Sequence, residues 1–87
     1  MSRIRRLRHR IQKLRLGKAQ VKPRQLVSLA TAIGRVLDKR GKEPTYVLRP
    51  LPPLSIPHHG KISKHTVDSM LDDLERDLDY LEEVENE

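Results

Sequence analysis

Two adjacent histidines, His58 and His59, stand in the short segment "SIPHHGK". Imidazole groups exchange protons near neutral pH and bind metal ions, so the pair suggests either acid–base chemistry or a metal site. A metal site needs further ligands, but the chain has no cysteine, and neither His9 nor His65 completes an H-x-x-x-H or H-E-x-x-H spacing. The sequence therefore predicts no metal site. A hydrogen-bonded loop histidine and a histidine that takes part in ligand contact or catalysis both stay open.

The charge of the chain is divided unevenly along its length. Residues 1–49 hold 15 Lys or Arg against two acids, whereas residues 50–87 hold three Lys or Arg against ten acids. A basic half of this density is typical of proteins that bind a polyanion, RNA or DNA above all. The other interpretation is that the two halves neutralise each other, within the molecule or across a dimer.

Two helical patterns precede the middle of the chain. Apolar residues at spacings of three and four predict a basic helix over residues 3–16 that ends at Gly17. A second helix is predicted from Pro23, which suits a first turn, to a cap at Gly34. This second helix is apolar on more than one side, which indicates the central element of the core. The apolar residues of the two helices are Ile4, Leu7, Ile11 and Leu14, then Leu26, Leu29, Ala30 and Ile33.

Three short strands are expected next, over residues 35–41, 45–49 and 54–57, because β-forming residues are bounded there by glycine and proline. The resulting α–α–β–β–β–α order predicts an α+β fold: a compact α-β-β-β-α unit with an extra basic N-terminal helix. We divide the chain into a basic amphipathic extension, residues 1–20, and a main domain, residues 21–87.

The last helix is predicted to begin after Ser63, a favourable N-cap residue. Its apolar stripe comprises Val67, Met70, Leu71, Leu74, Leu78 and Leu81, and its expected outer face carries Asp68, Asp72, Asp73, Glu75, Asp77 and Asp79. This stripe suits the stripe of the first helix, with Arg and Asp or Glu pairs at the margins. Exposed ion pairs contribute only about 0–1 kcal/mol each, so apolar burial is expected to stabilise the contact.

The element order and two short motifs resemble the HicA family of toxin–antitoxin mRNA interferases over roughly residues 24–75. The segment "GKEPTY", residues 41–46, stands where that family has Gly-Ser-His-x-x-Tyr, and "IPHHG", residues 56–60, stands at its Val-Pro-x-His-Gly pattern. The resemblance implies a double-stranded-RNA-binding-domain-like fold, an RNA ligand and a HicB-like antitoxin as protein partner.

The resemblance also implies site residues, with one departure. The histidine with which the family cleaves RNA corresponds here to Glu43, and His59 matches a structural histidine of the family. Cleavage needs a base for the 2′-hydroxyl proton and an acid for the leaving oxygen. Glu43, or His59 in its place, is therefore the expected catalytic group of an endoribonuclease. RNA contacts are expected from Arg35, Lys39, Arg40, Lys42 and Tyr46. The alternative is a non-catalytic RNA-binding or protein-interaction module on the same fold.

The basic first helix has several interpretations. It can line a surface for RNA phosphates, lie on an anionic membrane, act as an organellar transit peptide, or simply dock with its cations in water. The absence of Trp and Phe weakens the membrane interpretation. Tyr46 and Tyr80 are the only aromatic residues, so no platform for stacking single-stranded bases is expected, and contacts by shape and phosphate are favoured.

No cofactor is expected from these motifs. No apolar run approaches the about 20 residues of a membrane span, and no membrane partner is expected. The lack of cysteine is compatible with a reducing compartment, and a cytoplasmic location is expected.

Overall fold

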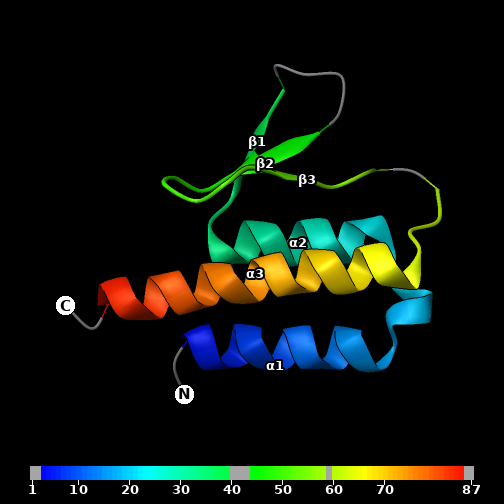
Figure 1. Ribbon diagram of the computed structural model, residues 1–87, viewed down its shortest axis with the longest axis horizontal. Helices are drawn as coiled ribbons and strands as arrows, with labels where there is room; N and C mark the ends of the chain where they lie inside the picture. Colours follow the sequence, from blue (N-terminus) through cyan, green and yellow to red (C-terminus); the bar gives the residue numbers. More distant parts are fainter. Residues whose placement is uncertain (1–2, 40–43, 59, 86–87) are drawn as a thin grey trace.

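Three helices lie on one side of a small antiparallel sheet in the computed structural model (Figure 1). The structure describes residues 3–39, 44–58 and 60–85. This confirms the α+β class and the predicted order of elements. The helices are α1 (Arg3–Leu16), α2 (Pro23–Ile33) and α3 (Lys64–Glu85), with a 3₁₀ turn, η1 (Lys18–Gln20), after α1; the strands are β1 (Val36–Asp38), β2 (Thr45–Val47) and β3 (Leu54–Ser55).

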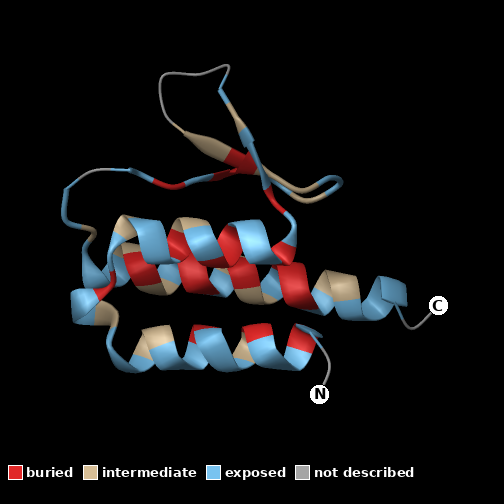
Figure 2. Ribbon diagram, turned by 180° about the vertical axis from the view of Figure 1, so that it is seen from behind, coloured by how far each residue is buried: buried red, intermediate tan, exposed pale blue. Residues whose placement is uncertain are grey.

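Strand β2 lies at the centre of the sheet. It pairs antiparallel with β1, where Leu37 is opposite Tyr46, and with β3, where Tyr46 is opposite Leu54. Tyr46 and Leu54 are buried in one core cluster with residues of the helices, so their side of the sheet is the covered one (Figure 2). Strand β1 is an edge strand, and its Val36 is 69% exposed.

Helix α1 belongs to the same core as the rest of the chain. Its stripe of Ile4, Leu7 and Ile11 is buried, and these side chains form one cluster with buried residues of α2 and α3 (Figure 2). A helix of this length is marginal by itself, so this burial is what stabilises it. The boundary expected at residue 20 therefore does not separate two cores, and α1 is an integral part of the fold rather than an extension.

Helix α3 is the central helix of the three. The apolar pattern of the sequence predicts α2 in this position, so that prediction is corrected. It begins after Ser63, whose Oγ accepts a hydrogen bond from the N–H of Thr66 at 3.2 Å, so the predicted N-cap is confirmed. It packs against α1 on one side and α2 on the other. None of the helices in the described ranges combines the length and apolar character that crossing a membrane requires.

The end of α2 directs the chain into the sheet. Gly34 has a φ of 124°, a region that L-residues with a side chain rarely adopt, and its N–H donates to the carbonyls of Ala30 and Thr31. The next residue, Arg35, is buried and stands immediately before β1. The glycine therefore allows the turn that places Arg35 between the sheet and α3.

Candidate nucleic-acid interface

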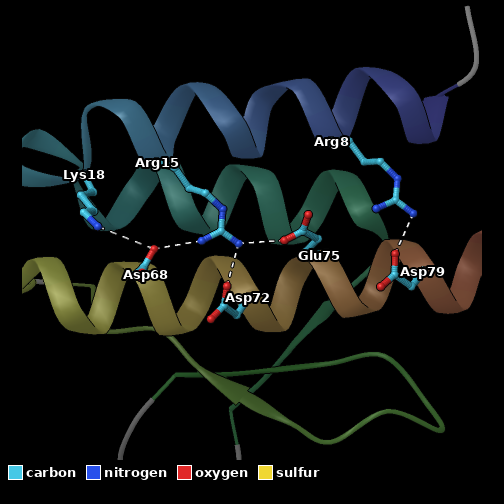
Figure 3. Close-up of polar contacts among 7 residues, drawn as sticks. All are labelled: Arg8, Arg15, Lys18, Asp68, Asp72, Glu75 and Asp79. Atoms are coloured by element: carbon cyan, nitrogen blue, oxygen red, sulfur yellow. Dashed lines mark hydrogen bonds and ion pairs between the residues drawn. The ribbon is translucent and has the colours of Figure 1, made fainter.

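Arg15 forms ion pairs across the contact between α1 and α3. Its Nη1 donates to Asp68 Oδ1 at 2.9 Å, while its Nη2 donates to Asp72 Oδ1 at 2.7 Å and Glu75 Oε2 at 2.8 Å. Figure 3 shows Arg15 pointing from α1 toward these carboxylates on α3. Lys18 of η1 adds a longer contact with Asp68, 3.9 Å between Nζ and Oδ1. One arginine thus contacts three acids of α3.

Arg8 repeats this arrangement further along the two helices. Its Nη2 lies 2.7 Å from Asp79 Oδ1 and 2.6 Å from Glu82 Oε2 (Figure 3 shows the Asp79 contact). Hydrogen bonds with Asp79 and then Glu82 raise the pKa of Arg8, and the hydrogen bond with Asp72 is the main cause that raises the pKa of Arg15. The predicted Arg–acid pairs at the margin of the two stripes are therefore confirmed. These guanidinium groups already contact protein carboxylates.

Arg35 lies inside the protein, with 2% of its side chain exposed. Its Nε and Nη2 donate to Asp77 Oδ2 and Oδ1 at 2.6 and 2.8 Å, and its Nη1 donates to the carbonyls of Tyr46 and Pro52 at 2.7 and 3.1 Å. A phosphate cannot reach this guanidinium in the folded chain. The expected phosphate contact at Arg35 is therefore corrected to a buried ion pair that joins the sheet to α3.

Tyr46 and His58 are joined by a hydrogen bond. Tyr46 is 3% exposed, and 2.7 Å separates its hydroxyl oxygen from His58 Nε2. Burial raises the pKa of the Tyr46 phenol. The hydrogen bond expected of a loop histidine is thus present at His58, and a role of this imidazole in ligand contact or catalysis stays a prediction. Tyr46 is buried, so its ring cannot stack on a base. In the described part of the chain, no three His, Asp or Glu side chains are grouped in a way that would hold a metal ion.

The other predicted site residues fall into two groups. Lys39 is exposed just after β1, on a surface that Arg49 also lines. Arg40, Lys42, Glu43 and His59 lie outside the described residues. Of the seven predicted site residues, the structure places Arg35 and Tyr46 close together, but as parts of the core. The expected catalytic groups thus stay predictions.

The acids of α3 neutralise only part of the basic half. Within the described ranges, six carboxylates of α3 pair with four cations of the basic half, Arg8, Arg15, Lys18 and Arg35, and a seventh, Asp73, pairs with Arg76 of α3 itself. A larger set of exposed cations has no acidic partner among the described residues. These cations are Arg3, Arg6, Arg10, Lys13, Lys22, Arg24, Lys39, Arg49, Lys61 and Lys64. Arg24 is absent from the RNA contacts that the sequence predicts, all of which lie between residues 35 and 46.

Comparison with protein-family models, with curated proteins and with solved structures gives no match to this chain. The HicA-like assignment therefore depends on the two short motifs and on the order of the elements.

Proposed function

We propose that this chain is an RNA-binding protein of the HicA-like kind, with a double-stranded-RNA-binding-domain-like fold, acting in the cytoplasm. The observation that carries the proposal is the distribution of ion pairs. The acids of α3 are concentrated on a few arginines, so many exposed cations elsewhere on the described surface are left without acidic partners. Mutual neutralisation of the two halves does not account for these cations, whereas a polyanionic ligand does.

We expect the protein to bind RNA through contacts with its phosphates rather than with its bases. The two tyrosines are the only aromatic residues of the chain, Tyr46 is buried, and Tyr80 is only partly exposed. Proteins that bind single strands by stacking need several exposed aromatic rings. Binding is therefore expected to depend strongly on salt and weakly on base sequence.

A salt titration of RNA affinity tests this proposal. A short RNA hairpin and a DNA duplex of matched length would be titrated with the full chain at several NaCl concentrations. We expect log Kd for RNA to rise with log salt, with a slope of about 0.7–0.9 for each phosphate contacted. A slope near zero contradicts any phosphate contact. Equal affinity for the DNA duplex contradicts RNA as the specific ligand.

RNA cleavage is the second candidate function, and the contact between Tyr46 and His58 favours it. Cleavage requires groups that exchange protons, and His58 lies within the "IPHHG" motif with its imidazole hydrogen-bonded to Tyr46. Expression of the chain in bacteria would be compared with Glu43→Ala and with His58→Gln. Growth arrest by the wild type, lost in one variant, identifies the acid–base group. If the wild type and both variants are equally harmless, cleavage is excluded and binding stands.

The HicA-like proposal also implies a HicB-like antitoxin as the protein partner of this chain. Strand β1 stands at the edge of the sheet with Val36 and Leu37 exposed, 69% and 36%, and it leads to Lys39. A protein that covers this strand would shield an apolar surface and block access to Lys39. Val36→Lys would therefore weaken binding of a HicB-like protein encoded beside this chain, measured by calorimetry, while leaving RNA affinity unchanged or slightly raised.

A further inference from the structure

A hollow between α1 and α2 gathers cations that α3 does not reach. Its volume is about 600 Å³, and its lining residues are Arg10, Lys13, Leu14, Arg24, Gln25 and Ser28. Three of the six are cations and none is an acid. Ser28 Oγ accepts a hydrogen bond of 3.3 Å from Arg10 Nη2, while Lys13 and Arg24 have no acidic partner in the described part of the chain. We call these six residues the α1–α2 groove.

The helical spacing explains why these cations stay unpaired. Arg8 and Arg15 are seven residues apart, two turns along the same side of α1, and that side faces α3 (Figure 3). Arg10 and Lys13 are three residues apart and flank the buried stripe on its other side, toward α2. The acidic helix therefore neutralises one side of α1 and leaves the other side positive.

From this arrangement we propose that the α1–α2 groove is a binding site for the phosphodiester groups of RNA, an inference that rests on the RNA binding proposed above. Arginine presents a planar fork of N–H donors that matches phosphate oxygens, and lysine adds a point charge. Ser28 and Gln25 supply uncharged polar groups on the α2 side, and the partly buried Leu14 forms an apolar floor. No aromatic side chain lines the groove, so the groove contacts the backbone of the nucleic acid and not its bases.

An anionic membrane fits this surface less well than RNA does. A helix that lies on a bilayer must insert its apolar face among the lipids. The apolar face of α1 is buried against the rest of the core, with Ile11 1% exposed. Insertion would require α1 to leave the core, whereas a phosphate backbone can occupy the groove while the fold stays intact.

Two matched triple variants test the site. The groove variant is Arg10→Gln, Lys13→Gln and Arg24→Gln, and the control is Arg8→Gln, Arg15→Gln and Lys18→Gln, which removes the same charge mainly from the side of α1 that faces α3. For the groove variant we expect RNA affinity to fall on the order of 100-fold at about 0.1 M salt, and the salt slope to fall by about two to three. The control is expected to lose less than about threefold in affinity and to keep the slope within about one. Circular dichroism would verify that both variants are folded.

A charge-preserving variant keeps the result interpretable if the control unfolds. Arg10→Lys with Arg24→Lys retains the positive charge but loses the planar forks, so we expect an intermediate loss of affinity with an unchanged salt slope. If the wild type binds RNA with a salt dependence, but the groove variant binds as tightly as the wild type or no more weakly than a folded control, the groove is overturned and RNA binding stands. If the wild type does not bind RNA at all, the proposed function itself fails. Binding of the wild type to phosphatidylserine vesicles that the groove variant loses, with RNA affinity unchanged, would assign the groove to lipid and overturn the proposal.

Discussion

Helix α3 makes two kinds of arginine–carboxylate contact, and burial is what distinguishes them. Asp77 meets Arg35 inside the protein, with both side chains at most 3% exposed, whereas Asp72 and Glu75 meet Arg15 at the surface, where their side chains are 56% and 46% exposed. Bond lengths at the two places are alike, from 2.6 to 2.9 Å. Exposure, rather than bond length, therefore distinguishes the two contacts, and we expect it to determine the energetic weight of each pair and its availability to other ligands.

Removing Asp77 is expected to have the largest effect on stability. Asp77→Ala leaves the guanidinium of Arg35 buried without its counter-ion, and breaking one side of a buried pair costs about 3–5 kcal/mol. The matched control is Asp73→Ala on the same helix, which removes a 3.7 Å contact with the exposed Arg76 and is expected to change the free energy of unfolding by less than about 0.5 kcal/mol. Urea denaturation followed by circular dichroism measures both. Equal losses for the two variants would contradict the distinction by burial.

The apolar stripe of α1 is expected to outweigh its ion pairs. Ile11 is 1% exposed, so Ile11→Ala should lower the free energy of unfolding by about 2–5 kcal/mol through lost burial and a cavity. Leu16 on the same helix is 90% exposed, and Leu16→Ala should stay within about 0.5 kcal/mol of the wild type. Both values come from urea denaturation. A small effect of Ile11→Ala would mean that α1 is held to α3 mainly by charge.

The contact between the buried Tyr46 and His58 predicts that the free energy of unfolding depends on pH. Tyr46→Phe removes the hydrogen bond with His58, which is worth about 1 kcal/mol near neutral pH. Burial raises the pKa of the Tyr46 phenol above its usual value near 10. The folded state thus holds this proton to higher pH than the unfolded state does, so the stabilisation is complete below about pH 10 and is lost as pH rises further.

Unfolding curves between neutral pH and alkaline pH measure this dependence. Above about pH 10, the free energy of unfolding of the wild type should fall more steeply than that of Tyr46→Phe. The control, Tyr80→Phe, removes the other phenol of the chain and leaves the contacts of Tyr46 in place. Parallel curves for wild type and Tyr46→Phe would contradict a buried phenol.

The helices and their partners were predictable from the sequence because periodicity specifies them directly. The stripe of α1 predicts both a helix and a docking partner, and the acidic margins of the last helix predict the pairs with Arg15. Proline and glycine likewise mark the ends of α2, and a proline directly precedes β2 and β3, but all three strands are shorter than the ranges predicted from glycine and proline. These signals are local, so a single sequence contains them.

The buried pair could not be predicted in the same way. A strand of three residues, such as β1, is too short for alternation to show which way the preceding Arg35 points. Asp77 looks like one more acid of the outer face, yet it follows Met70 by seven residues, on the same side of the helix as the buried stripe. That spacing was the available signal for an acid with a buried partner. The α1–α2 groove depends on Arg24 lying beside α1, and only the tertiary structure shows this proximity.

The exposed pairs of Arg15 should give the smallest change in stability and the clearest contrast with Asp77. Arg15→Gln removes contacts with Asp68, Asp72 and Glu75, and we expect a loss of about 0–1 kcal/mol because these groups are partly exposed to solvent and screened. About 0.5 M NaCl should reduce the difference between wild type and Arg15→Gln, since exposed charges are screened over a few ångströms at high salt. The same salt should leave the loss in Asp77→Ala nearly unchanged, because water and ions do not reach the buried pair. A salt-insensitive loss for Arg15→Gln as large as that for Asp77→Ala would mean that the contact between α1 and α3 excludes water. In that case the surface pairs would determine the position of α1 as strongly as its apolar stripe does.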